Sequence, residues 1–152
     1  MTDDTRSLLN ELIETCNDGE QGFIRAAEDV KEGNLKAVFT ECAGRCRNAA
    51  SELQTLVRNA GGTPESTGSI KGAIHRGWMD LKTKFTSRDS LAVLEEVERG
   101  EDYAKARYNQ ALTMDLPSNI RAVVQRHYDG AVANHDRVRN LRNQFREQAK
   151  TA

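Results

Sequence analysis

The sequence predicts an all-α protein, a four-helix bundle formed by one domain. Long stretches repeat apolar residues every three or four positions, which is the spacing of an amphipathic helix. The two prolines, Pro64 and Pro117, fall between these stretches, where they interrupt no helix. Aromatic residues are 5% and charged residues 30% of the chain, as in a helical bundle rather than a sheet protein. We therefore expect residues 1–152 to fold as a single helical domain.

The first two helices are expected at 5–31 and 35–60. The first carries an apolar stripe of Leu9, Ile13, Cys16, Phe23 and Ala27. Gly33 and Asn34 are interpreted as the stop signal of the first helix and the cap of the second. A turn this short makes the two helices antiparallel neighbours.

A long connection, residues 61–89, separates this pair from the last two helices. It begins with glycines and Pro64, and it is expected to contain a shorter helix at 69–85. The third long helix is expected at 90–113 and the fourth at 118–148, separated by the break around Pro117. The long connection can travel the length of the bundle, so the predicted order is up-down-down-up. One long crossover of this kind is the topology of ferritin-like bundles.

Acidic residues interrupt two of the apolar stripes. Glu20 lies in the stripe of the first helix, and Glu101 lies at the centre of the third, with Glu98 on its flank. Burying an ionised carboxylate without a partner costs several kcal/mol or forces it to take up a proton. An inward acid therefore indicates a metal ion, a basic partner or a shared proton.

Counting the helical rise places several polar residues at one depth of the bundle. This layer contains Glu20, Glu98, Glu101 and His135, with Glu52 close to it. Carboxylate oxygens and imidazole nitrogens suit iron, manganese or zinc, so these five residues are the candidate metal ligands. The alternative is that Glu52 and Glu98 face water, that His135 is a boundary histidine, and that Glu101 pairs with an arginine of the last helix, where Arg142 is angled inward.

A symmetric two-metal centre would lack ligands. Di-iron bundles of this type use a Glu-x-x-His motif on two helices. Here Thr55 follows Glu52 at the third position, and Val132 precedes His135 by three. A site for one metal fits the sequence better. His127 lies about two turns away from this layer and is interpreted as a core histidine with satisfied hydrogen bonds.

Composition limits the partners and the compartment. The three cysteines, Cys16, Cys42 and Cys46, lie on apolar helix faces, which favours buried free thiols in a cytoplasmic protein over thiolate metal ligands. No stretch approaches the roughly 20 apolar residues of a membrane span, and no secretory leader is evident. The last helix is basic, but acids interrupt it, so nucleic acid is not an expected partner.

The sequence resembles bacterial four-helix-bundle proteins of unknown function in the ferritin-like group, over nearly its whole length. Eight segments carry this resemblance: Asp18–Phe23, Ala26–Val30, Glu52–Gln54, Gly61–Pro64, Gly68–Ser69, His75–Trp78, Glu98–Asp102 and Asn134–Val138. It implies a ferritin-like fold and a metal site, and it transfers no reaction.

Two functions therefore remain open from the sequence. The first is a ferritin-like bundle with a metal site and a redox or stress-related use. The second is a non-enzymatic structural or interaction module with salt-bridged acids and a homo-oligomer interface. The segment His75–Trp78 either docks the crossover helix on the bundle or forms an oligomer contact, since Trp is enriched in interface hot spots. No phosphate-binding glycine loop or catalytic triad motif is present.

Overall fold

The computed structural model describes residues 1–64 and 89–151, which form four long helices. They are α1 (Asp3–Asp29), α2 (Gly33–Asn59), α4 (Ser90–Leu112) and α5 (Ser118–Thr151). Each predicted long helix is confirmed, with its bounds shifted by at most three residues. The expected helix at 69–85, with its His75–Trp78 segment, lies outside the described residues.

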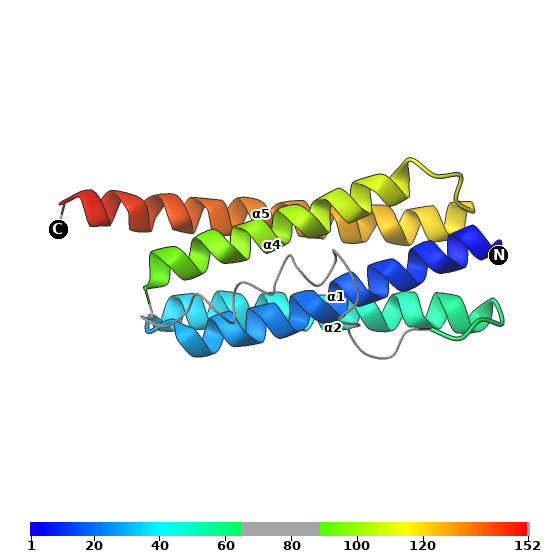
Figure 1. The fold of residues 1–152 in the computed structure, drawn as a ribbon, viewed down its shortest axis with the longest axis horizontal. Coiled ribbons are helices and arrows are strands. Elements are labelled where there is room, and N and C mark those ends of the chain that lie inside the picture. Colours follow the sequence, from blue (N-terminus) through cyan, green and yellow to red (C-terminus); the bar gives the residue numbers. More distant parts are fainter. Residues whose placement is uncertain (65–88, 152) are drawn as a thin grey trace.

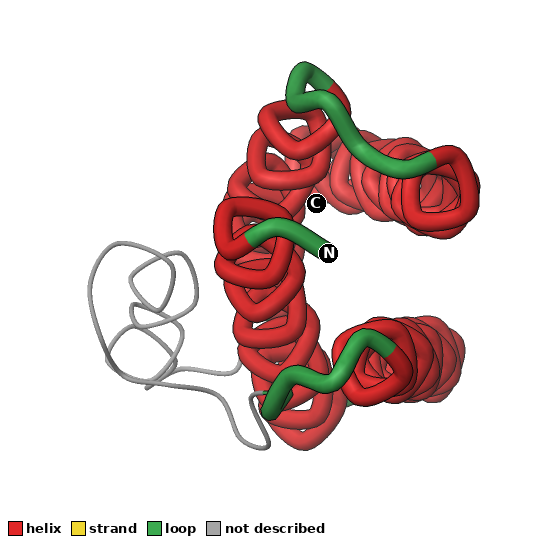
Figure 2. The backbone as a smooth tube through the Cα atoms, turned by 90° about the vertical axis from the view of Figure 1, so that its right-hand side faces the viewer, coloured by secondary structure: helices red, strands yellow, loops and turns green. Residues whose placement is uncertain are grey.

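The four helices have the predicted up-down-down-up order. α1 and α5 run in one direction along the long axis, and α2 and α4 run in the other (Figure 1). α1 packs against both α2 and α4, and α5 packs against α4. In contrast, α2 and α5 approach each other at few positions, and the view along the helices shows them more widely separated (Figure 2).

The helix ends differ from the prediction at one turn. α1 ends at Asp29, the extended backbone of Val30 follows, and α2 already begins at Gly33. Asn34 therefore lies inside α2, and Glu32 occupies the N-cap position without a side-chain capping bond. Among the described residues, the glycine with positive φ is Gly61, at 83° after α2, and not Gly33. The left-handed conformation that favours glycine is thus used where α2 ends.

Side-chain caps begin α1 and α4. The hydroxyl oxygen of Thr2 accepts a hydrogen bond from the backbone N–H of Thr5 at 3.1 Å. The carboxylate of Asp89 accepts one from the N–H of Leu91, also at 3.1 Å. Such caps satisfy N–H groups that have no partner within the first turn of a helix.

The buried core consists of two apolar clusters, one toward each end of the bundle. The first includes Leu9, Ile13, Leu53, Val57 and Val124, and the second includes Phe23, Phe39, Val93, Val97 and Val138. The middle of the bundle, between these clusters, carries small and polar side chains from all four helices. This middle level is where the candidate site lies. In the described part of the chain, no helix has the length and apolar character needed to cross a membrane.

Candidate functional site

A cavity of about 350 Å³ occupies the middle of the bundle. Its walls come from α1, α2, α4 and α5, and several lining side chains are small: Gly19, Ala49, Ala104, Gly130 and Ala131. The lining residues Arg45, Asn48 and Arg126 are exposed, so the cavity reaches the surface between α2 and α5. The wide α2–α5 seam is therefore its mouth.

Glu101 is the buried acid of this cavity. The residue is 5% exposed, and its Oε1 atom has no hydrogen-bond partner among the described residues. Burial, with the nearby carboxylates of Asp102 and Glu98, raises the pKa of Glu101 to about 9. The side chain is therefore a neutral carboxylic acid at pH 7, which can donate one hydrogen bond and accept others.

Glu52 lies at the mouth of the cavity with two basic partners from α5. Its oxygens accept hydrogen bonds from both terminal nitrogens of Arg126, at 3.0 and 2.6 Å, and Oε1 lies 2.7 Å from Nε2 of His127. The hydrogen bonds from Arg126, with a smaller effect of His127, lower the pKa of Glu52 to about 2. Glu52 is thus an ionised member of an interhelical ion pair.

His127 has only one of its two ring nitrogens satisfied by the described residues. Burial lowers its pKa, so the ring is neutral at pH 7. Because Nε2 faces the ionised Glu52 carboxylate, Nε2 carries the proton and Nδ1 is left as an acceptor. Nδ1 is buried and has no partner in the described part of the chain. Within the described ranges, His127 is therefore satisfied at one ring nitrogen, which differs from the expected core histidine with satisfied hydrogen bonds.

Glu98 and His135 form a second polar group, between α4 and α5. The carboxylate of Glu98, which is 9% exposed, accepts a hydrogen bond from Arg142 and lies 3.6 Å from Nε2 of His135. That same nitrogen lies 2.7 Å from the carboxylate of Asp102. The alternative to a metal layer paired Glu101 with Arg142, but the guanidinium instead reaches Glu98, which lies one turn away and faces α5.

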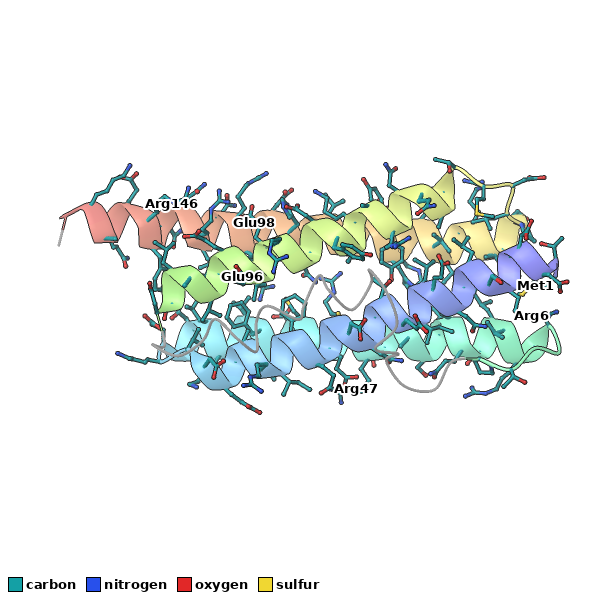
Figure 3. All side chains as sticks on the ribbon, viewed as in Figure 1. Met1, Arg6, Arg47, Glu96, Glu98 and Arg146 are labelled. Atoms are coloured by element: carbon teal, nitrogen blue, oxygen red, sulfur yellow. The ribbon has the colours of Figure 1, made fainter. Side chains whose placement is uncertain are left out.

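Glu20 points away from this group. Its carboxylate lies 3.0 Å from Nε of Arg47, and the side chain is 19% exposed at the α1–α2 seam. In Figure 3, Arg47 lies at the outer edge of the α1–α2 pair, whereas Glu98 lies on the side of α4 nearest α5. The two acids therefore belong to different seams of the bundle.

As placed here, the five predicted ligands do not fit a metal ion. Glu20, Glu52 and Glu98 each have an arginine partner, and a guanidinium beside a carboxylate repels a divalent cation. In the described ranges, no three His, Cys, Asp or Glu side chains are grouped so that they could hold a metal ion. Among the five, Glu101 alone lines the cavity with a carboxyl oxygen that lacks a partner in these ranges.

Cys16 and Cys42 are buried, as the sequence indicated, whereas Cys46 is half-buried. Burial raises the pKa of Cys16 to about 11 and that of Cys42 to about 12, and it raises the pKa of Cys46 well above its ordinary value. Sγ of Cys16 lies 3.0 Å from the hydroxyl of Tyr108. Because so small a fraction of these thiols is ionised at neutral pH, they are poor nucleophiles and poor metal ligands.

Polar pairs link α2 and α5 at the mouth of the cavity and beyond it. Arg137 donates to Glu41 at 2.9 and 3.3 Å, and Arg45 donates to Oδ1 of Asn134 at 3.1 Å. The Glu52–Arg126 pair completes the series. Gly130 leaves room for the Arg45 guanidinium, which lies against its backbone. These three pairs, which we call the α2–α5 polar seam, hold the helices together where apolar packing is sparse.

Sequence reasoning missed two residues of this site, Arg45 and Asn134, and it missed that Nδ1 of His127 has no partner among the described residues. The sequence contained one signal that could have identified the polar face of α2. Arg45, Glu41 and Glu52 are separated by four and seven positions, so they lie along one face of α2. The partners on α5 could not be read from the sequence, because the spacing of helical faces does not fix the rotation of one helix against another.

Comparison with known proteins places the chain in a family. Residues 4–114, most of the chain, match the family described as a domain of unknown function (DUF2383), and the chain belongs to that family. This match includes α1, α2 and α4. No curated protein matches the sequence.

A solved structure shows the same fold. It is the bacterioferritin-related protein from Bacteroides fragilis, described as a dodecameric thioferritin. The alignment covers 97% of this chain and 91% of that chain, with a TM-score of 0.75 and 15% sequence identity. At this identity the likeness shows the fold alone. The ferritin-like architecture expected from the sequence is therefore shown.

Proposed function

We propose that this chain, which belongs to the family above and has a ferritin-like fold, is a non-enzymatic interaction module. It assembles with further copies of itself. The observation that carries this proposal is the ion pairing of the acids. Glu20, Glu52 and Glu98, which a metal centre would use, each have an arginine partner on a neighbouring helix. The Glu98–Arg142 pair is largely buried, so removing one of its partners is costly, whereas the more exposed pairs of Glu20 and Glu52 contribute less to the stability of the bundle.

Two further observations support a module without chemistry of its own. The three thiols have raised pKa values and are poor nucleophiles. His127 has a lowered pKa, but its Nε2 is engaged by Glu52, so the ring lacks the arrangement of a nucleophile and its base. The assembly is supported by the fold, since the similar bacterioferritin-related protein is described as dodecameric.

The test combines molar mass and metal content. Light scattering after size exclusion should give a multiple of the 16.9 kDa chain mass, and elemental analysis should find less than one metal ion per chain after incubation with iron, manganese or zinc. A protein that stays monomeric at all concentrations and retains stoichiometric metal would overturn the proposal.

A matched pair of variants sharpens this test. Glu52 and Glu41 both lie on α2 and pair with arginines of α5, but only Glu52 is a predicted metal ligand. In the proposed module, Glu52→Ala and Glu41→Ala both lower thermal stability and leave metal content at background. If Glu52→Ala removed bound metal and Glu41→Ala did not, Glu52 would be a ligand.

A second candidate function is the metal-binding bundle, and one observation favours it. The carboxyl oxygen of Glu101 is buried without a partner in the described ranges, at the centre of a ferritin-like bundle. In this candidate, Glu101 would hold iron, manganese or zinc with Glu98 and His135, after Arg142 releases Glu98. The ion would supply Lewis-acid or redox chemistry. Glu101→Ala should then abolish bound metal and lower the melting temperature of the metal-loaded protein.

A further inference from the structure

The mid-bundle cavity has the size of a small-molecule site. Its volume of about 350 Å³ lies within the roughly 300–1,000 Å³ of ligand pockets. The space arises from the sequence, because small residues stand on the facing positions of all four helices. The two apolar clusters of the core close it above and below.

Two buried polar atoms of this cavity have no partner in the described part of the chain. They are Oε1 of Glu101 and Nδ1 of His127. Buried polar groups are almost always hydrogen-bonded, and leaving one unsatisfied costs about 1–3 kcal/mol. Because both residues line the cavity, a guest that reaches these two atoms would satisfy them.

The two atoms lie at different depths of the cavity. His127 meets Tyr108 edge-on, with ring centroids 6.3 Å apart, and Tyr108 lies seven residues after Glu101 on α4. Seven residues of helix rise about 10 Å, so the Glu101 and His127 levels are separated by roughly that distance. Between them the walls are mostly apolar, formed by Cys16, Ala104 and Ala131. The cavity is therefore elongated, with a hydrogen-bonding group toward each end.

The charge state of the lining favours an uncharged occupant. The carboxyl of Glu101 is 5% exposed, and its Oε1 atom has no partner among the described residues, so burial disfavours its charged form. The charges of Glu52 and Arg126 compensate each other at the mouth. Arg45 already donates to Asn134. A charged guest would lose its hydration without gaining a free opposite charge in the buried part.

We propose that this cavity binds a small, elongated, uncharged organic molecule with an apolar middle and a hydroxyl or amide group near each end. One end donates a hydrogen bond to Nδ1 of His127, and the other exchanges hydrogen bonds with the carboxylic acid of Glu101. The guest enters through the α2–α5 polar seam, past Arg45. This site is independent of whether the chain assembles into oligomers.

The probe is octanediol with a hydroxyl at each end, compared with octanoate and octylamine of the same chain length. Binding to the full chain is measured by titration calorimetry and by saturation-transfer NMR. The neutral diol should bind, and the anion and the cation should bind at least 10-fold more weakly. Amide shifts should appear around Glu101 and His127.

Four variants locate the site and identify the role of Glu101. Glu101→Gln keeps a donor and an acceptor, so it should retain diol binding within about 3-fold, whereas Glu101→Leu should weaken it by about 10-fold, as expected for one lost hydrogen bond. Ala104→Leu fills the cavity and should abolish binding, with helical content unchanged by circular dichroism. Glu41→Gln is the control, since Glu41 lies on the seam but not in the cavity.

Three outcomes would overturn the proposal. The first is that the folded protein does not bind the diol at millimolar concentration, which would leave water as the occupant of the cavity. The second is tight binding of octylamine that Glu101→Gln abolishes, which would make the cavity a cation site. The third is diol binding unaffected by both Ala104→Leu and Glu101→Leu, which would place the diol elsewhere.

Discussion

Replacing Glu101 by Gln should stabilise the protein, and increasingly so at higher pH. In the folded chain the pKa of Glu101 is about 9, compared with 4.5 for an ordinary Glu side chain. Below pH 4.5 both the folded and the unfolded chain hold the proton. Between pH 4.5 and 9 only the folded chain keeps it, so folding must take up a proton, and the free energy of unfolding falls as pH rises.

The magnitude follows from the size of the pKa shift. Each pH unit above 4.5 removes about 1.4 kcal/mol, which amounts to about 3 kcal/mol at pH 7 and about 6 kcal/mol at pH 9. Gln has nearly the same shape and does not titrate. The variant should therefore match the wild type near pH 4.5 and exceed its free energy of unfolding by about 3 kcal/mol at pH 7.

Urea unfolding followed by far-ultraviolet circular dichroism, at intervals from pH 4.5 to 9, measures this difference. Glu41→Gln is the control: Arg137 lowers the pKa of Glu41, so the effect of that substitution should not change over this range. If the wild type and Glu101→Gln lose stability in parallel, or if the wild type gains stability with pH, then Glu101 is ionised in the folded chain and the reasoning fails.

Three further outcomes are expected. Glu52→Gln should lower the free energy of unfolding at pH 7 by about 1 kcal/mol, because Glu52 is 38% exposed and its ion pair is partly screened. This difference between wild type and variant should vanish as pH falls from 4.5 toward 2, and it should also vanish in 1 M salt. Cys16 has a pKa of about 11, so iodoacetamide at pH 8 should alkylate it about 100-fold more slowly in the native chain than in urea. Mass spectrometry follows the reaction, and equal rates in the two conditions would contradict the burial of Cys16. Leu53→Ala should cost about 2–5 kcal/mol in urea unfolding, because Leu53 is fully buried; a loss below 1 kcal/mol would show that the core collapses around the gap.

The sequence by itself determined the four long helices and their order. Apolar periodicity and the break around Pro117 depend on neighbours along the chain, and these local signals placed the helix ends within three residues. The short turn before α2 makes α1 and α2 antiparallel, and the long crossover lets α4 run parallel to α2. Together these two connections predict the up-down-down-up topology. The sequence also identified Glu101 as a buried acid, because a carboxylate at the centre of an apolar stripe must be buried when that stripe faces the core.

Only the tertiary structure decided what those acids contact. Periodicity shows which side of a helix faces inward, but the partner of a long side chain depends on the rotation and offset of the opposite helix. Arg142 therefore pairs with Glu98 and not with Glu101, and Glu20 pairs with Arg47 at an outer seam. The same freedom separates α2 from α5 and opens the cavity between them, where His127 and Glu101 keep polar atoms for which the described chain supplies no partner.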